Sequence, residues 1–422
     1  MNSPMVFRSH SISRKNILRT PIPWVALLFL LLIVPHFKTA YIDTFDSADL
    51  LFNAARVASM LITVALYAVK GRRADARVGL LIVFELCLLL STLLHGGAVV
   101  PFVSSYALGL GVYLLVDLYS DRPRMIVRVL FFIGELLVYV NLASMIIAPD
   151  GLYVSKLLGY YHNWVLGYKN QFLPFFICFA TVAFLQMRYS RKRLRPAALI
   201  VAMLLSLVLG KSATSLIVMV IFVAGMMIAE TRARLVFNPY LLAIVVVFAF
   251  FVIVLMSSSE TISGLIAAIA NRDVTFSGRT VIWGSVMDAI AQKPLFGWGV
   301  MSDESHIALI DHVEASSAHN FYLELLLSGG VVSLLVYGVF VVLVLKRLKS
   351  CEGTYAAKLC AVALFALGIA YMTEAYSNPI IFALFALAAN VGEYANAEKE
   401  SDLVVSSSKK RPPVATSLPV AN

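Results

Sequence analysis

The stretch that decides how this chain is organised is SGRTVIWGSVMDAIAQKPLFGWG at residues 277–299, followed by AHNFYLELLLSGG at residues 318–330. Both segments belong to, or directly follow, a polar interruption at residues 257–320 in a chain of 422 residues that is otherwise apolar. Such an interruption is where a water-soluble group can be held against a bilayer. We therefore expect the functional site there.

The composition is that of a polytopic membrane protein. Hydrophobic residues make up 60% of the chain and charged residues 14%, and the mean hydropathy is +0.86. Apolar runs repeatedly reach the roughly 20 residues that a helix needs to cross a hydrocarbon core. The net charge of +10 is divided into short clusters between these runs, so it reports membrane topology and argues against nucleic acid as a partner.

The apolar runs predict an all-α fold, a membrane bundle of about twelve transmembrane helices with a long helical extracytoplasmic loop. The expected spans are residues 22–37, 50–69, 78–95, 98–119, 125–148, 168–187, 197–210, 212–229, 240–257, 321–345, 357–373 and 378–393. Residues 196–229 are too long for one span, and Gly210 is expected to permit the turn that divides them.

The basic residues support this division of the chain. With a cytoplasmic N-terminus, 26 of the 34 Lys and Arg residues fall in cytoplasmic segments, as the positive-inside bias requires. Both termini are then cytoplasmic. The predicted parts are a basic N-terminus at residues 1–21, nine spans over 22–257, an extracytoplasmic catalytic loop at 258–320, three spans over 321–393 and a disordered cytoplasmic tail at 394–422. The first span is expected to be an uncleaved signal anchor.

Eight cations break the topological rule. They are Lys38, Arg56, Lys156, Lys169, Lys211, Arg272, Arg279 and Lys293. A charge at a position that insertion disfavours usually meets an anion or a polar partner. Arg56 shares a helical face with Asp49 and Asn53, so an internal ion pair with Asp49 or a snorkelling head group is the alternative to a binding role. Lys211 lies in the expected turn between two short spans.

The polar segment carries its own structure. Residues 279–292 have apolar positions at helical spacing, which predicts an amphipathic helix, and Trp283 has the character of an interfacial anchor. Asn320 is a good N-cap for the span that follows, so His319 should stand at a helix entrance.

The remaining histidines and the cysteines have simpler interpretations. His306 and His312 lie among acidic residues and are expected to be solvated loop residues. No ligand spacing typical of a metal site is present, so no metal and no cofactor are expected. The four cysteines are expected to pack as small apolar residues.

The order of SGRTVIW, KPLFGWG and AHNFYLELLLSGGVVSLL resembles the O-antigen ligase and polymerase superfamily of bacterial envelope glycosyltransferases. The upstream segments GYKNQFLPFF at 167–176 and GKSATSLI at 210–217 resemble weaker membrane motifs of that family. The resemblance covers roughly residues 160–345. It implies a helical membrane bundle in the bacterial cytoplasmic (inner) membrane, with a helical loop over a lateral cavity.

The resemblance implies that a glycan passes from a polyprenyl (undecaprenyl) diphosphate carrier to a sugar hydroxyl, with inversion and without a metal. The family's catalytic histidine falls on His319, its loop arginine on Arg279, and a second cation on Lys211, where lysine lacks the bidentate fork. Lys169 and Arg56 are further candidates for diphosphate contact. Two residues would support the site: Asn320, and Glu324, which could orient the imidazole or accept a hydrogen bond from a loop amide.

Three functions are compatible with the sequence. A polymerase would join lipid-linked repeat units into exopolysaccharide, capsule or O-antigen, and the compact loop favours it. A ligase would pass finished glycan to lipid A core or another acceptor. A lipid-linked oligosaccharide flippase would place cations along a cavity, but it would not require a His–Asn pair at a loop–helix junction. The implied partners are the lipid-linked glycan, membrane lipid, a chain-length regulator and a repeat-unit flippase.

Overall fold

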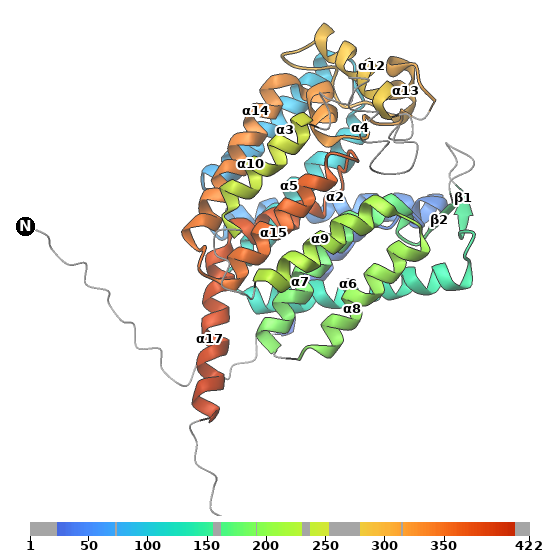
Figure 1. Ribbon diagram of the computed structural model, residues 1–422. Helices are drawn as coiled ribbons and strands as arrows, with labels where there is room; N and C mark the ends of the chain where they lie inside the picture. The colour runs from blue at the N-terminus through green and yellow to red at the C-terminus, as the bar shows by residue number, and fades with distance from the viewer. Residues whose placement is uncertain are drawn as a thin grey trace, which may run out of the picture.

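The computed structural model describes residues 23–71, 74–154, 162–190, 192–229, 237–252, 279–313 and 315–409. The expected cytoplasmic N-terminus, residues 258–278 of the expected loop and the end of the expected tail lie outside these ranges. The described part is mostly helical, which confirms an all-α membrane bundle. In Figure 1, helices α12 (Arg279–Gln292) and α13 (Asp303–Ile310) lie at one end of the bundle, and α17 (Val391–Lys409) lies at the other.

Six helical runs in the described part are long and apolar enough to cross a membrane. They are α2 (Asp46–Val69), α3 (Ala76–Leu94), the run of α4 (Val99–Phe102), η4 (Val103–Ala107) and α5 (Leu108–Leu118), α6 (Pro123–Ile147), η5 (Lys169–Phe172) with α7 (Leu173–Ser190), and α14 (Phe321–Ser350). Five shorter apolar helices are α1 (Pro23–Ile33) with η2 (Val34–Phe37), α8 (Leu194–Leu209), α9 (Ala213–Ala229), α10 (Pro239–Phe250) and α15 (Tyr355–Ala370). A sixth, α16 (Ile381–Ala389), is apolar but has only nine residues. All twelve overlap expected spans, but the count of twelve stays a prediction because half are short.

The apolar stretch at 196–229 divides at the expected place. Helix α8 ends at Leu209 and α9 begins at Ala213. The left-handed residue of the turn is Lys211 (φ 52°), whereas Gly210 has helical dihedral angles. The turn therefore does not use the conformational freedom of Gly210; a Cβ there would lie 3.2 Å from Cβ of Lys169, so the turn and the start of η5 are closely packed.

Helix α14 is bent where the long loop returns to the membrane bundle. Gly330 has a left-handed φ of 64°, and a Cβ there would lie 2.2 Å from the carbonyl oxygen of Leu295. The bend lets residues 294–299 bond to the helix backbone: Trp298 N donates to Leu327 O at 2.7 Å, and Val331 N to Pro294 O at 2.9 Å. The loop is thereby fixed to α14, the helix that carries the functional junction at its start.

A small apolar cluster joins α12, α13 and the start of α14. Its buried members are Ile282, Trp283, Val286, Ala289, Ile310, Ala315, Ala318, Leu323 and Leu327. The helix predicted at residues 279–292 is confirmed as α12. The prediction that Trp283 is an interfacial anchor is wrong: the side chain is 1% exposed, because it packs in this cluster and its Nε1 donates to the Ala318 carbonyl at 3.0 Å.

A short antiparallel sheet, absent from the sequence prediction, precedes α7. Strand β2 (His162–Trp164) pairs with β1 (Tyr153–Val154) and β3 (Gly167–Tyr168), with Asn163 opposite Tyr153 on one side and Tyr168 on the other. The amide of Leu166 donates to Asn141 Oδ1 on α6 at 2.9 Å. This anchors the segment that leads directly into η5.

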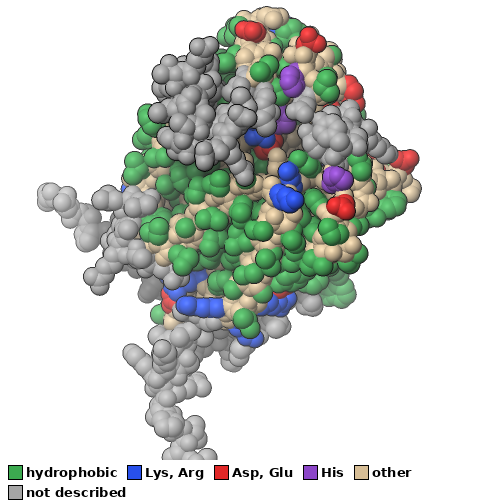
Figure 2. All heavy atoms as spheres, turned by 45° about the vertical axis from the view of Figure 1, so that its right-hand side comes forward, with side chains coloured by type: hydrophobic (Ala, Val, Ile, Leu, Met, Phe, Trp, Pro, Cys, Tyr) green, Lys and Arg blue, Asp and Glu red, His purple; other side chains and the backbone are tan. Residues whose placement is uncertain are grey.

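The expected disordered tail is wrong for residues 394–409, which belong to α17. Polar and acidic side chains of α17 bond to basic residues at the ends of the membrane helices. Arg188 bonds to Glu398 at 2.9 Å and to Asp402 at 2.7 Å, and Arg124 donates to Ser401 at 2.9 Å. In Figure 2 basic side chains gather at the lower edge of the apolar surface, while acidic and histidine side chains are seen above it. The cytoplasmic orientation of the termini stays a prediction.

Candidate active site

The carboxylate of Glu374 joins three side chains from distant parts of the chain. Oε1 accepts from Arg279 Nη2 at 2.5 Å and from Asn170 Nδ2 at 2.7 Å, and Oε2 lies 3.2 Å from Nδ1 of His319. The site is shielded but open to solvent, since the side chains of Glu374 and Arg279 are 14% exposed and that of His319 is 23% exposed. Figure 2 shows basic, acidic and histidine side chains meeting in a hollow on this face.

Helix α14 begins in a way that presents His319 to Glu374. Asn320 is the N-cap, as predicted, and its side-chain oxygen accepts from the amides of Tyr322 and Leu323. The Asn320 amide nitrogen also donates to Met372 O at 3.1 Å, and the main-chain N of Phe321 donates to Tyr371 O at 2.8 Å. These bonds fix the start of α14 to the segment after α15, which carries Glu374.

The backbone at His319 is in the left-handed region, with φ 46°. This conformation is uncommon for a residue with a side chain and persists where surrounding contacts impose it. The contacts on either side of His319 are those of Asn320 and those that hold Ala318, whose carbonyl accepts from Trp283. The imidazole is therefore positioned by the backbone on both sides.

Arg279 is the first residue of α12, so its position depends on how that helix is anchored. The buried Trp283, one turn further along, bonds to Ala318 and ties the first turns of α12 to the segment that carries His319. The loop arginine and the helix-junction histidine predicted from sequence thus meet on one carboxylate.

The segments around Lys169 and Lys211 form the other wall of the site. Ser212 Oγ donates to Asn170 Oδ1 at 3.0 Å, which joins the turn between α8 and α9 to η5. Lys211 is exposed and Lys169 half-buried, and the close approach of Lys169 to Gly210 puts the two lysines on adjoining segments.

The roles predicted for Lys211 and His319 require both residues to lie in one site. The observed link is a chain of hydrogen bonds that begins at Ser212, the residue after Lys211. It runs from Ser212 to Asn170, from Asn170 to Glu374 and from Glu374 to His319. Lys211 is therefore the neighbour in sequence of a residue that these hydrogen bonds connect to His319, and its place in the site stays a prediction.

Arg56 lies in a different polar cluster. Its guanidinium donates to Asn53 Oδ1 at 3.3 Å and to the Ser104 carbonyl at 3.0 Å, and the residue is 8% exposed. Asp49, the ion-pair partner considered from sequence, bonds to Lys38. The contacts of Arg56 thus connect α2 to η4 and do not bring it to Glu374.

Glu324 does not orient His319; that position is taken by Glu374. Its Oε2 accepts from the Ala318 amide at 2.8 Å, as the alternative from sequence predicted, and also lies 3.3 Å from His306 Nε2. The prediction that His306 is solvated is therefore wrong: it is 2% exposed, because α13 folds over the start of α14. Among the described residues, no group of three or more His, Cys, Asp or Glu side chains is arranged to hold a metal.

The electrostatic environment assigns a protonation state to the site. Burial raises the pKa of Glu374, but the hydrogen bond from His319, the charge of Arg279 and the bond from Asn170 outweigh it, so the net pKa is lowered. Glu374 is then a carboxylate near neutral pH. A carboxylate can only accept, so Nδ1 of a neutral His319 carries the proton and Nε2 carries the lone pair.

A lateral apolar cavity of about 420 Å³ begins beside this polar site. It is lined by α10, α14 and α15, which lie side by side in Figure 1. Tyr322 and Tyr371 line the end nearest the site, and Pro239 and Leu345 line the far end. Tyr322 and Tyr371 lie three residues from His319 and Glu374 in the sequence, so the cavity lining includes the first turn of α14 and the segment that carries Glu374.

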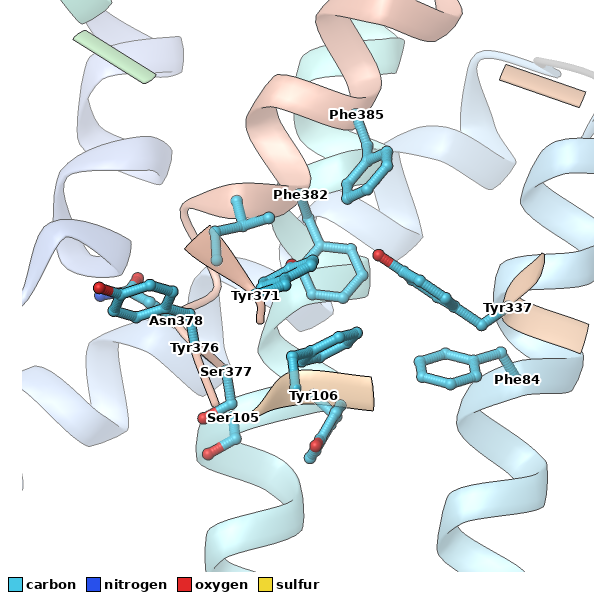
Figure 3. A pocket seen from close by; sticks show the side chains of 12 residues that line it. Phe84, Ser105, Tyr106, Tyr337, Tyr371, Tyr376, Ser377, Asn378, Phe382 and Phe385 are labelled. Atoms are coloured by element: carbon cyan, nitrogen blue, oxygen red, sulfur yellow. The ribbon is translucent and has the colours of Figure 1, made fainter. Parts of the chain in front are cut away.

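A second pocket, of about 10 Å³, has room for about one water molecule. Its lining is mainly aromatic, and in Figure 3 the rings of Tyr106, Tyr337, Tyr371 and Phe382 converge on it. The ring of Tyr371 also stacks on Phe321, with centroids 4.0 Å apart. This small pocket is part of the packing that supports the segment before Glu374.

Glu374 and Asn170 are the functional candidates that the sequence analysis missed. Glu374 is the only acidic residue between Glu352 and Glu393. The rest of that segment consists mainly of two apolar runs. An acidic residue between two apolar runs is as unfavourable for membrane insertion as a misplaced cation, so the rule that selected the eight cations also selects Glu374. Asn170 carries no comparable signal, because an uncharged amide after an expected loop is unremarkable in sequence.

Comparison with known families gives one match. Residues 198–338 match the family model described as O-antigen ligase. No curated protein matches the chain. The matched region contains Lys211, Arg279 and His319 but ends before Glu374. The resemblance identified from the ordered motifs is confirmed.

Proposed function

Because residues 198–338 carry a domain of the O-antigen ligase and polymerase superfamily, we propose that this multi-pass membrane protein is a glycosyltransferase that uses a polyprenyl-diphosphate-linked glycan. The observation that carries the proposal is the meeting of His319, Arg279 and Glu374 beside an apolar cavity. The site would thus supply a base, a cation that can bind a phosphate group and a cavity that can hold a lipid chain.

In the proposed reaction His319 is the general base. Glu374 accepts from Nδ1, so Nε2 takes the proton of the acceptor hydroxyl as its oxygen attacks the anomeric carbon. The bond between that carbon and the diphosphate oxygen breaks, and its electron pair goes to the oxygen. The anomeric centre is inverted. The products are the extended glycan and polyprenyl diphosphate.

The departing diphosphate needs positive charge. Arg279 has five N–H donors, one of which is bonded to Glu374, and a guanidinium can bind phosphate oxygens in pairs. Lys169 and Lys211 would add charge from the opposite wall. Arg56 is not given this role, because its contacts place it in another cluster.

The apolar cavity would hold the first isoprenoid units of the carrier. Its lining at the polar end includes Tyr322 and Tyr371, so a lipid chain there would leave the diphosphate beside Arg279 and His319. The cavity is lined by the membrane helices α10, α14 and α15, and we expect the lipid to enter it from the bilayer.

The compact loop favours a polymerase that joins repeat units, and a ligase remains the second candidate. The test uses purified protein in sealed proteoliposomes with lipid-linked repeat units only. A product ladder identifies a polymerase; product only after addition of lipid A core identifies a ligase; movement of the glycan across the bilayer without a new bond identifies a flippase.

His319→Ala is expected to abolish glycan transfer and leave the lipid-linked donor unconsumed, while His162→Ala, an exposed histidine in β2, retains it. Wild-type product from His319→Ala would refute the assignment of the base. Transfer by neither the wild-type protein nor the control would refute the proposed function.

A further inference from the structure

We propose that His306 is a positioning residue: together with Glu324 it binds one buried proton, and that proton holds the segment that presents His319. The inference rests on the role proposed for His319. The catalytic site itself does not use His306, which lies on α13 and contacts neither Glu374 nor Arg279 through its own hydrogen bonds.

The hydrogen-bond geometry requires the proton. Nδ1 of His306 lies 2.7 Å from the carbonyl oxygen of Ala315, which can only accept, so Nδ1 carries a hydrogen. Nε2 of the same ring lies 3.3 Å from Oε2 of Glu324. Without a further proton, a nitrogen lone pair would face a carboxylate oxygen in a buried setting, which is repulsive.

The remaining contacts of Glu324 are consistent with one shared proton. Oε2 accepts from the Ala318 amide at 2.8 Å, and the Ser328 hydroxyl lies 3.3 Å from Oε1. Whether the imidazole or the carboxyl group holds the proton, the pair is neutral as a whole. The contact has the distance of an ion pair but not the alignment of a linear hydrogen bond.

The pair holds both ends of a four-residue segment. His306 binds the carbonyl of Ala315 and Glu324 binds the amide of Ala318, and both alanines are fully buried. The next residue is His319, in its left-handed conformation. Loss of the pair would therefore release the backbone that aims the imidazole at Glu374.

The surroundings favour retention of the proton. Burial lowers the pKa of His306, but the charge of Glu324, the bonds to Glu324 and Ala315 and the charge of Asp303 outweigh it, so the net pKa is raised. Asp303 lies three residues earlier on α13. From the other packed elements, Asp288 on α12 is exposed, His312 is in the turn after α13, and Tyr106 of η4 faces Glu324.

The sign of the pH dependence follows. A group whose pKa is raised by folding stabilises the folded form fully below its ordinary value of about 6.5, and this stabilisation is lost as pH rises through the folded pKa. Deprotonation leaves a buried carboxylate facing a lone pair. Turnover should therefore fall on the alkaline side while binding of the donor is retained.

The experiment compares four proteins in nanodiscs with lipid-linked repeat units across a pH series: wild type, His306→Gln, His306→Gln with Glu324→Gln, and the control Glu304→Gln. Glu304 is an exposed acid on the same helix. His306→Gln leaves Glu324 without its counter-charge and should lower kcat about tenfold or more with little change in KM. The double variant replaces the charged pair by two amides, so it should recover most of kcat and lose the alkaline limb of the pH profile.

Three results would overturn the inference: a wild-type kcat and alkaline limb in His306→Gln, a double variant as impaired as the single one, or an alkaline limb that persists in the double variant. Hydrogen–deuterium exchange of residues 303–313, measured near pH 6 and near pH 9, tests the pair without any enzymatic assay. After correction for intrinsic exchange, protection should fall at high pH in the wild type and not in the double variant. Absence of glycan transfer with this pH-dependent protection would refute the proposed function but not the proton-holding pair.

Discussion

Replacing Glu374 with Gln should inactivate the protein by moving one proton on His319. Oε1 of Glu374 accepts from Arg279 and Asn170, two groups that can only donate at those atoms. The amide oxygen of Gln must therefore occupy that position, and its NH2 group then faces Nδ1 of His319. Nδ1 becomes an acceptor, so the ring proton moves to Nε2, the nitrogen that must take the proton of the acceptor hydroxyl.

The size of the effect follows from the loss of the correct tautomer. In a histidine–carboxylate pair of this kind, conversion of the acid to its amide lowers kcat by about 10³- to 10⁴-fold. That corresponds to about 4–5.5 kcal/mol of transition-state stabilisation. The KM for the lipid-linked donor should change little, because Arg279 keeps one acceptor and its remaining N–H donors.

Single-turnover kinetics with a radiolabelled lipid-linked glycan measure this effect separately from product release. Glu393→Gln, at the next acidic residue along the chain, is the matched control, and it should retain wild-type turnover. A Glu374→Gln variant with kcat within about threefold of wild type would refute the tautomer argument. A change confined to KM would show instead that Glu374 acts only by positioning Arg279.

Three further predictions concern the same site and its cavity. Arg279→Lys keeps the charge but loses the paired donors, so KM for the donor should rise about 10- to 100-fold, and an unchanged KM would remove Arg279 from phosphate binding. Leu364→Trp narrows the apolar cavity, so it should impair use of a long polyprenyl carrier more than use of a short-chain analogue. Leu335→Trp, on an exposed face, should not show this difference. Equal effects of Leu364→Trp on both carriers would contradict a lipid-binding cavity. Because folding lowers the pKa of Glu374, its stabilising contribution is present above the ordinary value of about 4.5 and is lost as pH falls further, so thermal unfolding of the wild type, but not of Glu374→Gln, should show that acid-dependent step.

Local rules predicted the elements that local residues control. The apolar stripe at 279–292 gives α12 with the expected bounds, and Asn320 caps α14 because its side chain needs only the amides two and three residues later. The stretch at 196–229 also divides at the predicted place, although Lys211 and not Gly210 has the left-handed conformation of the turn.

The errors arose where a distant segment decides the environment. Trp283 and His306 have the composition of surface residues, but α12 and α13 fold onto the start of α14 and bury both. Residues 394–409 are mostly polar, and their helix is held by the buried Tyr394 and by Arg124 and Arg188 from other helices. Glu374 lies in the site because the Asn320 side chain bonds to the Met372 carbonyl, and no spacing in the sequence predicts that contact.

The charges of the site suggest how the proposed reaction proceeds. Before transfer, Glu374 balances part of the charge of Arg279, so Arg279 binds the diphosphate with its remaining N–H donors, and Lys169 and Lys211 add positive charge. When His319 takes the hydroxyl proton, it becomes a cation 3.2 Å from Glu374 and can balance that carboxylate itself. Arg279 is then released to the diphosphate at the moment its charge increases. In the proposed mechanism, Glu374 thus couples proton removal from the acceptor to stabilisation of the leaving group, which explains why one carboxylate should contact both cations.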